Sequence, residues 1–429
     1  MGTAIALTIA VGLPSISVAG TPPSPSLIPA VSGQAPTAQP SGSTSPGPCA
    51  AAVTAAVATS PAPSQVPDAS PTPLTVTPRV IPMAAAWGDV PVHSIATDLG
   101  HDRRFTFAGA ATSDGEWLIG ASQPKEFSIE GKVTWGRSDA VLVRVADGEV
   151  RRMAKLTSPL SQLVFAASDG PWVVWMESDD NPYGYDWHLR VYDRDTGTTQ
   201  ELAHAPHKDG AVLEGPWPVP WVSGGLVVWG QAIGPLTGDD PLRNAVVREE
   251  DLRTGTRTTL ADHAGLPAIS WPWMAWGVDE GGETYTLVTN VETGQQERLD
   301  TTFHTLVLEG ASAAWNTMDY HVVCLVDDLA TGTVARPIVA DTDNTFEWMT
   351  LNDRAVGFYQ QSLDPDAEFG KEPTQVYDRR LDALIDLPMV VGFSQTYAVG
   401  PLVVWQTPTK HWDDYPDLIR VVDTRDITR

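Results

Sequence analysis

The sequence predicts an all-β protein: a seven-bladed β-propeller with four antiparallel strands in each blade, preceded by a disordered N-terminal tract. Three observations support this prediction. An apolar segment that ends in an aromatic residue recurs through residues 89–429, an alternating segment with a turn follows each copy, and residues 20–82 consist mainly of Pro, Ala, Ser and Thr. A six-bladed ring is the alternative, because the first and sixth copies match the repeat poorly.

The apolar segment is clearest in three nearly identical stretches: GPWVVW (170–175), GGLVVW (224–229) and GPLVVW (400–405). The last large aromatic residue of each copy gives seven anchors, spaced by 39 to 58 residues: Trp117, Trp175, Trp229, Trp276, Trp315, Phe358 and Trp405. Periods of this length are typical of propeller blades. A continuous apolar run predicts a strand covered on both faces, and its Trp is large enough to fill the gap between radiating sheets.

The second segment alternates apolar and polar residues, as in LRVYDRDTGTTQEL after Trp175 and TLVTNVETGQQERL after Trp276. Alternation is the period of a strand, and the Asp-x-x-Thr-Gly hinge has the residues that favour a tight turn. Each repeat therefore reads as four strands, A to D from the channel outward. In the second blade we expect these strands at Leu163–Ala166, Trp172–Glu177, His188–Tyr192 and Thr198–Ala203.

Ring closure is the next requirement, because a single blade cannot bury its two apolar faces alone. The last repeat ends at Arg429, with little sequence left for its outer strand. A spare strand-like segment, VPVHSIATD (90–98), precedes the first full repeat. We expect it to pair as the outer strand of the last blade.

The N-terminal region divides into two parts in front of the propeller at residues 89–429. Residues 1–20 are apolar, and Ser17-Val18-Ala19 resembles a signal-peptide cleavage site, although no Lys or Arg precedes the apolar run. A membrane anchor is the alternative, although Pro14 interrupts the run and the apolar stretch is shorter than the ~20 residues of a spanning helix. Residues 21–85 have the composition of an extended linker. These features predict an extracytoplasmic protein, secreted or held at the cell surface.

Composition limits the partners and the chemistry. The net charge of −26 argues against nucleic acid, because phosphate binding needs a cationic surface. No G-x-S-x-G elbow, P-loop or dinucleotide fingerprint is present. Cys49 and Cys324 are far apart and indicate neither a disulfide framework nor a metal site, and Cys324 is expected to be a small core residue. We therefore predict no cofactor and favour a non-enzymatic role, while an enzyme remains the open alternative.

The repeat units GPWVVW…LRVYDRDTGTTQEL and ISWPWMAWG…TLVTNVETGQQERL resemble those of TolB-like and WD-repeat-like bacterial β-propellers, in particular exported ones with a low-complexity N-terminal tract. The resemblance covers about residues 90–429. It implies a protein- or ligand-binding scaffold outside the cytoplasm, and it brings no catalytic residues that can be transferred to this chain.

Aromatic residues in the B–C loops are candidate binding residues. In a propeller the B–C and D–A loops share one face, and loops on a rigid scaffold tend to carry function. The stretches SDDNPYGYDW and HWDDYPD mix aromatic and acidic residues, and their candidates are Tyr183, Tyr185, Trp187, Trp412 and Tyr415. Such side chains can stack on a sugar or hold a peptide. The alternative is that they pack over the blade edge.

Histidines form a second candidate site. They follow the strand-D leucines of three successive blades: His204, His207, His263 and His304. If these D–A connections converge at the channel, the imidazoles would suit a divalent metal or acid–base chemistry. The alternative is a set of unrelated loop histidines.

Three functions follow from these observations. The favoured one is a monomeric scaffold at the cell envelope that binds a protein or glycan through its B–C/D–A loop face. The second is a metal-assisted lyase or other small-molecule enzyme with a histidine cluster at the channel mouth. The third is a structural spacer of the envelope, tethered through the N-terminal segment.

Overall fold

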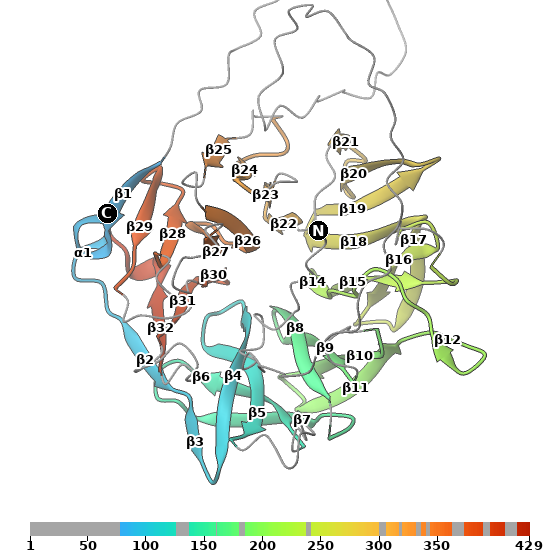
Figure 1. The fold of residues 1–429 in the computed structure, drawn as a ribbon, viewed down its shortest axis with the longest axis horizontal. Coiled ribbons are helices and arrows are strands. Elements are labelled where there is room, and N and C mark those ends of the chain that lie inside the picture. Colours follow the sequence, from blue (N-terminus) through green and yellow to red (C-terminus); the bar gives the residue numbers. More distant parts are fainter. Residues whose placement is uncertain are drawn as a thin grey trace, which may run out of the picture.

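The fold is a ring of seven β-sheets that radiate from a central channel (Figure 1). The computed structural model describes residues 78–125, 137–159, 161–179, 185–236, 242–299, 306–316, 320–331, 336–339, 344–362, 373–388, 395–407 and 418–429. The seven-bladed propeller is confirmed. The predicted segment 1–20 and most of the predicted linker 21–85 lie outside these residues.

Blades 1 to 4 each contain strands A to D in sequence order. Blade 1 has β4 (Arg103–Ala111), β5 (Trp117–Pro124), β6 (Asp139–Arg144) and β7 (Val150–Lys155), with β3 (Asp98–Gly100) beside β4. Blade 2 has β8 (Gln162–Asp169), β9 (Trp172–Ser178), β10 (Trp187–Asp193) and β11 (Thr198–His204). Blade 3 has β14 (Trp221–Ser223), β15 (Leu226–Ala232), β16 (Ala245–Asp251) and β17 (Thr256–Asp262). Blade 4 has β18 (Ala264–Ser270), β19 (Trp273–Glu280), β20 (Glu283–Asn290) and β21 (Gln296–Leu299).

Blades 5 to 7 follow the same order, and the last two take strands from the N-terminal side of the chain. Blade 5 has β22 (Leu306–Glu309), β23 (Ser312–Asn316), β24 (Val322–Val326) and β25 (Arg336–Val339). Blade 6 has β26 (Asn344–Leu351), β27 (Ala355–Ser362), β28 (Gln375–Asp378) and β29 (Ala383–Asp386), with β1 (Arg79–Pro82) outside β29. Blade 7 has β30 (Thr396–Val399), β31 (Leu402–Thr407), β32 (Leu418–Asp423) and β2 (His93–Ala96). A short hairpin of β12 (His207–Lys208) and β13 (Ala211–Val212) separates blades 2 and 3, and η1 (Thr424–Asp426) follows β32.

The aromatic anchors lie on strand B, as predicted, and pack against the preceding blade. Trp175 shares a core cluster with Ile119 and Leu142 of blade 1. Trp229 shares one with Val174 and Leu189 of blade 2. In these blades the buried Trp of strand B thus fills the widening gap between sheets and joins neighbouring blades.

Blade 1 departs from this pattern. Trp175 is the fourth residue of its strand, whereas Trp117 is the first residue of β5 and pairs with Arg144 at the end of strand C. The fourth position of β5 is Gly120, and a Cβ there would collide with the Phe105 ring and with a backbone carbonyl of β4. The alignment of Trp117 with Trp175 is therefore wrong by three residues, because Phe105 fills the space that a Trp fills elsewhere.

The predicted Asp-x-x-Thr-Gly turns close the outer hairpins. In blade 2 the Asp193 carboxylate accepts the N–H of Asp195 at 2.9 Å, and Gly197, with φ of 70°, donates its N–H to the Asp193 carbonyl at 2.8 Å. The same arrangement recurs at Asp251–Gly255 and Asn290–Gly294. Glycine is required because this φ is unfavourable for residues with a Cβ.

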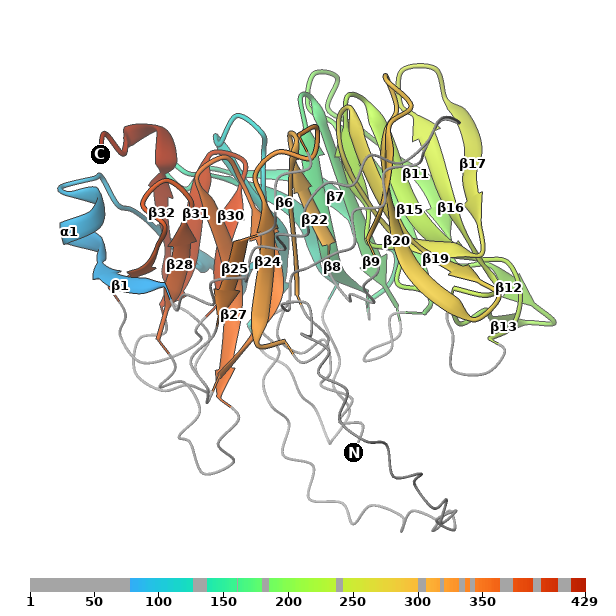
Figure 2. The same cartoon turned by 90° about the horizontal axis from the view of Figure 1, so that it is seen from above.

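The A–B turns are linked from blade to blade around the ring. In blades 1 to 4 a side chain of the turn accepts a backbone N–H from the turn of the next blade. The donor–acceptor pairs are Gly170 to Ser113 (3.1 Å), Gly224 to Asp169 (2.7 Å), Trp271 to Ser223 (2.9 Å) and Gly310 to Ser270 (2.7 Å). These short turns lie along one face of the ring when it is seen edge-on (Figure 2). They hold the ends of the inner strands in a fixed spacing around the channel.

The ring closes as predicted, through β2, which pairs antiparallel with β32 as the outer strand of blade 7. An unpredicted closure lies beside it. Strand β1 pairs in parallel with β29, and α1 (Met83–Trp87) buries Met83 and Trp87 against blades 6 and 7. The folded region therefore begins before residue 89, because the apolar residues of α1 belong to the core and not to the linker. Among the described residues no helix is long and apolar enough to cross a membrane.

A buried polar cluster ties the two ends of the described chain to blade 6. Asp378 accepts hydrogen bonds from Trp87 Nε1 and Arg354 Nε, each at 2.8 Å. Arg354 Nη2 donates to the carbonyl of Arg429 at 3.0 Å. The C-terminus accordingly lies beside β1 and α1 in Figure 1. We call these four residues the closure cluster.

Cys324 is buried on β24, as expected for a core residue, but it is also disulfide-bonded. Its partner lies outside the described residues. The sequence pattern alone did not indicate this bond, because the two cysteines of the chain are separated by most of its length.

Candidate functional site: the channel cavity

The inner strands enclose a cavity of about 720 Å³ in the central channel, within the usual size range of ligand sites. Its walls run from the middle of the inner strands to the A–B turns, which form one mouth of the channel. The polar residues that these turns and the adjoining strand ends contribute are Ser113, Ser168, Asp169, Ser223, Ser270, Glu309, Asp353 and Arg354. We call this opening the A–B mouth. It is on the opposite face of the ring from the B–C and D–A loops, where the sequence predicts the candidate binding site.

Three aromatic rings meet across the channel and close the inner end of this cavity. Phe165 belongs to β8 of blade 2, Trp217 precedes β14 of blade 3, and Trp348 belongs to β26 of blade 6. The Trp217 and Trp348 rings are nearly parallel, with centroids 6.1 Å apart. Phe165 lies 6.0 Å from Trp217 and 6.4 Å from Trp348. Phe165 and Trp348 line the cavity, so this aromatic cluster forms its floor.

The backbone is bent to bring Trp348 into this position. Trp348 has φ of 48°, at a β-bulge between Glu347 and Thr350. A second non-glycine residue of the cavity wall, Leu266, has φ of 51° at a bulge of β18. Such conformations cost of order 1–3 kcal/mol and are held by the surrounding structure. Bulges redirect side chains, and here they accompany the wall of the cavity.

Acidic groups gather at the A–B mouth. Glu309 ends β22, and burial raises the pKa of its carboxyl to about 7, with the nearby carboxylates of Asp353 and Asp169 adding to the effect. Arg379 acts in the opposite direction. No described residue donates a hydrogen bond to Glu309, whereas Asp169 accepts the N–H of Gly224. Glu309 is therefore a largely buried carboxyl group that receives no hydrogen bond from the described residues and lies near two other acids.

The predicted aromatic loop residues are only partly within the described chain. Trp187 is 4% exposed and packs with Leu189 and Trp229 between blades 2 and 3. Tyr185 is partly exposed and borders a shallow depression with Trp187 and Trp217. Trp187 thus packs at the blade edge, the alternative that the sequence left open. Tyr183, Trp412 and Tyr415 lie outside the described residues, and binding at these loops stays a prediction.

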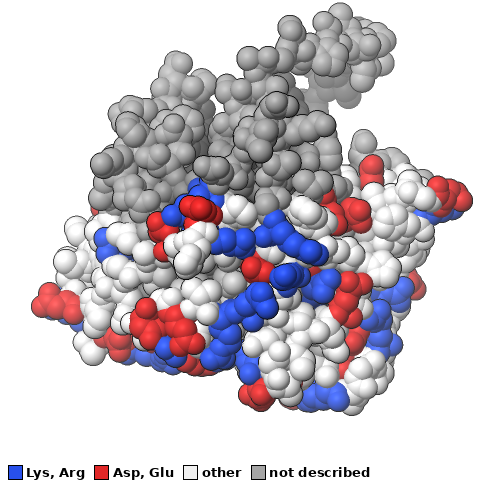
Figure 3. Space-filling model, turned by 90° about the horizontal axis from the view of Figure 1, so that it is seen from below, with Lys and Arg blue, Asp and Glu red and all other residues white. Residues whose placement is uncertain are grey.

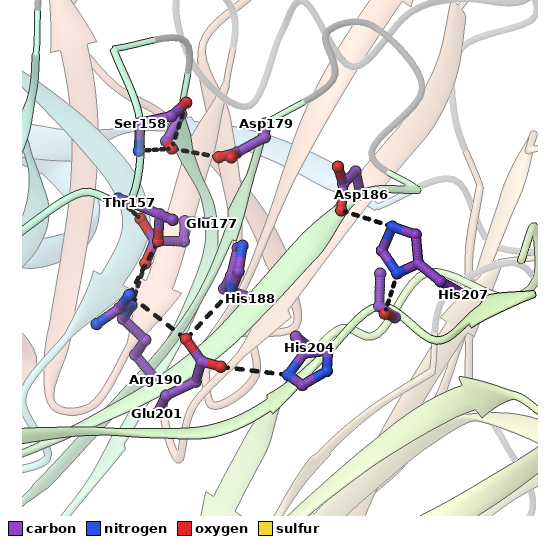
Figure 4. Close-up of polar contacts among 12 residues, drawn as sticks. Thr157, Ser158, Glu177, Asp179, Asp186, His188, Arg190, Glu201, His204 and His207 are labelled. Carbon is purple, nitrogen blue, oxygen red and sulfur yellow. Dashed lines mark hydrogen bonds and ion pairs between the residues drawn. The ribbon is translucent and has the colours of Figure 1, made fainter. Parts of the chain in front are cut away.

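Two of the predicted histidines lie near a polar cluster on blade 2 (Figure 4). Glu201 has His188 Nδ1 and His204 Nδ1 at 3.2 Å and Arg190 Nη2 at 3.5 Å. Arg190 also forms an ion pair with the fully buried Glu177, which accepts the N–H of Thr157 at 2.9 Å. We call these groups the rim cluster. His204 is exposed and contacts a carboxylate that His188 and Arg190 also contact.

The other histidines point to different partners. His207 lies 3.8 Å from Asp186, and Nδ1 of His263 contacts the carbonyl of Arg243. His304 lies outside the described residues. Among the residues that the structure describes, no three His, Cys, Asp or Glu side chains are placed to hold a metal ion. The structure thus does not bring His204, His207 and His263 together, and a metal site that includes His304 stays a prediction.

The sequence does not predict the residues of the channel cavity. It predicts Phe165 on an inner strand but assigns it no role at the channel. One usable signal was present: every inner strand of a propeller borders the channel, so a large aromatic residue at its middle is a candidate lining residue. Trp348 satisfies the same criterion on β26.

Charge is unevenly distributed outside the cavity. Figure 3 views the molecule from the side that carries β3 and β7, at the lower edge of Figure 1. Lys and Arg side chains lie between groups of Asp and Glu on this face, although the chain carries a net charge of −26. The overall charge therefore does not describe every face of the molecule.

No family model matches the chain, and no curated protein matches it. Solved structures are similar at low identity. The β-propeller domain of the Trilobed protease from Pyrococcus furiosus is 10% identical over 78% of this chain and 98% of that one, with a TM-score of 0.47. TolB from Acinetobacter baumannii is 14% identical over 53% of this chain and 57% of that one, with a TM-score of 0.32. Acylaminoacyl peptidase from Pyrococcus horikoshii is 10% identical over 78% of this chain and 53% of that one, with a TM-score of 0.47.

The sheet topology itself defines the class, a β-propeller protein. The chain spans just over half the length of the TolB and acylaminoacyl peptidase chains. At these identities the likeness concerns the fold and not the activity.

Proposed function

We propose that this chain is an extracytoplasmic, non-enzymatic binding protein that takes a segment of a partner protein into the channel cavity through the A–B mouth. The observation that carries the proposal is the cavity itself, about 720 Å³ in volume, with an aromatic floor and a polar rim. This combination of apolar walls with a few polar groups is typical of binding sites.

The rigidity of the walls supports the proposal. The cavity is bordered by inner strands, each held in a sheet, and by A–B turns that are hydrogen-bonded to the next blade. A site built on strands keeps its shape without the bound segment, which lowers the entropic cost of binding.

The extracytoplasmic location rests on two features. The sequence begins with an apolar segment of the kind expected for export. Cys324 is disulfide-bonded, and disulfides persist in oxidising compartments. Mass spectrometry of the protein exported by its native host should find a processed N-terminus and no free thiol under denaturing, non-reducing conditions. A cytoplasmic protein with two free thiols would contradict the location.

The binding proposal is tested with a library of soluble peptides screened against the full chain by affinity selection, followed by calorimetry of the selected peptides. Ala167 lines the cavity on β8, so Ala167→Trp should fill it without removing a core side chain. We expect Ala167→Trp to abolish binding of the selected peptides. Tyr285→Ala, on strand C of blade 4 away from the cavity, is the matched control and should bind as the wild type does.

Two results would overturn the proposal. If no peptide is selected, or if Ala167→Trp binds the selected peptides as tightly as the wild type, the channel cavity is not the binding site. If oligosaccharides bind in a parallel glycan array and no peptide binds, the ligand of the cavity is a glycan and not a protein segment.

A further inference from the structure

The cavity offers charged and aromatic groups in addition to its volume. We infer that the channel cavity selects a basic side chain, lysine or arginine, in the bound segment, with Asp169, Glu309 and Asp353 at the mouth and the rings of Phe165 and Trp348 at the floor. This inference rests on the proposed function and specifies the chemistry of its ligand.

The acids provide the first part of the selection. Asp169, Glu309 and Asp353 come from the A–B turns of three different blades, and all three line the same cavity. Each of the other two carboxylates disfavours ionisation of Glu309, and no described residue donates a hydrogen bond to it. An entering ammonium or guanidinium group would supply both the missing donor and the missing positive charge.

The aromatic floor provides the second part. Phe165 and Trp348 are both partly exposed to the cavity. The face of an aromatic ring attracts a cation, and this attraction is stronger in a site with little water. The apolar stem of a lysine or arginine would meanwhile pack on the inner strands, as long basic side chains commonly do.

The protein's own cations near the mouth are mostly engaged elsewhere. Arg354 forms an ion pair with Asp378 at 2.8 Å, Arg379 with Asp327 at 3.1 Å, and Arg425 with Asp423. Arg380 is the exception among the described residues that line the cavity, because it is exposed and the structure records no ion pair for it. Arg380 is therefore the natural competitor of a cationic ligand, and its removal should strengthen binding.

The test uses three acetylated pentapeptides with the sequence Gly-Ala-Xaa-Ala-Gly, in which Xaa is Lys, Gln or Glu. Binding to the full chain is measured by calorimetry at pH 8, where Glu309 is ionised. We expect the Lys peptide to bind about tenfold more tightly than the Gln peptide, and the Glu peptide to bind most weakly. Phenethylammonium chloride, as a second probe, distinguishes a free organic cation from a basic side chain in a peptide.

Two variants move the preference in opposite directions. Glu309→Gln should reduce the preference for Lys over Gln by about fivefold, and Arg380→Gln should increase it by a few-fold, as expected when a like charge is removed. Glu283→Gln, an exposed glutamate on β20 that pairs with Arg298, is the matched control and should change nothing.

The outcomes separate this inference from the proposed function. If the Lys and Gln peptides bind equally, or if Glu309→Gln keeps the full preference, charge selection is wrong while the binding cavity stands. If phenethylammonium binds and the Lys peptide does not, the ligand is a small amine and the inference of a basic side chain is wrong. If no probe binds and the peptide library of the preceding test is also empty, both ideas fail.

Discussion

Asp378 and Glu309 lie at the same end of the ring and are both withdrawn from water, but their surroundings are opposite. The Asp378 side chain is fully buried and accepts hydrogen bonds from Trp87, Arg354 and the backbone N–H groups of Arg380 and Leu381. Glu309 receives no hydrogen bond from the described residues, and its pKa is raised to about 7. Burial alone therefore does not describe the surroundings of a carboxyl group, because the number of hydrogen-bond donors around it also differs.

The difference in hydrogen-bond donors indicates a structural role for Asp378 and a binding role for Glu309. A buried charge with a full set of partners stabilises the arrangement around it, and removing one partner leaves the others uncompensated. A buried carboxyl group without hydrogen-bond donors lowers the stability of the fold, and such groups are typical of functional sites. Asp378 belongs to ring closure, whereas Glu309 is the residue that we connect with ligand recognition.

The largest expected effect comes from Asp378→Ala. It leaves the Arg354 guanidinium buried without its ion pair, and breaking such a pair typically costs about 3–5 kcal/mol. Urea unfolding at pH 7 measures the free energy of unfolding of variant and wild type. Asp195→Ala, at an exposed position of the blade 2 turn, is the control and should stay within about 0.5 kcal/mol. A loss below about 1 kcal/mol for Asp378→Ala would contradict the role of the closure cluster.

Glu309→Gln should raise the free energy of unfolding, whereas Asp378→Ala should lower it. A carboxyl with a raised pKa holds its proton in the folded state after the unfolded state has lost it, so folding stability falls as the pH rises from about 4.5 to about 7. Removing this carboxyl should make the variant up to about 3 kcal/mol more stable than the wild type at pH 8, with little gain at pH 4. Unfolding free energies at both pH values decide the matter, and equal differences at the two pH values would refute the assignment.

Trp87→Phe tests the contribution of the N-terminal side of the chain to the closure cluster. Phenylalanine keeps most of the buried area but loses the N–H that Asp378 accepts, and hydrogen bonds to charged groups contribute about 1.5–3 kcal/mol. We expect a loss of about 1.5–2 kcal/mol in urea unfolding. Trp271→Phe is the matched control, since its N–H donates to the exposed Glu292 at 3.1 Å. Equal losses in the two variants would show that burial of the pair is unimportant.

The smallest effect is expected in the rim cluster. Glu201 contacts three basic side chains, but it is 37% exposed, and exposed ion pairs contribute about 0–1 kcal/mol. Glu201→Gln should therefore lower the free energy of unfolding by less than about 1 kcal/mol. Glu177→Gln, in the same cluster but fully buried, should cost more. The reverse order would mean that the number of partners matters more than their exposure.

The ring was predictable because its determinants are local and repeated. Trp175, Trp229 and Trp405 report the same buried position of strand B, and the Thr-Gly turns report the same hairpin. The closing strand could be anticipated because the last repeat lacked a strand that an earlier segment could supply. The repeat pattern gives the wrong anchor in blade 1. There the Phe105 ring, from the neighbouring strand β4, fills the space that a strand-B Trp fills in other blades, and Trp117 lies at the start of its strand.

The candidate site was not predictable in the same way. Trp348 reaches across the channel because its backbone takes a positive φ at a bulge, and a pattern of apolar and polar residues does not encode that conformation. The raised pKa of Glu309 depends on Asp169 and Asp353, which come from blades 2 and 6. Both features arise from residues that are distant in sequence, so they require the assembled ring.

The pairing of β2 with β32 also sets an order of events during synthesis. Ser94 and Arg420 are hydrogen-bonded across this pair, although 326 residues separate them. At ordinary translation rates this separation corresponds to roughly 16–65 s, during which β2 is an unpaired strand edge. Such an edge is a site for wrong pairing until its partner arrives. The ring can therefore close only when β32 has been made, and a chain cut short of β32 would leave the blades on both sides of the closure open to other molecules.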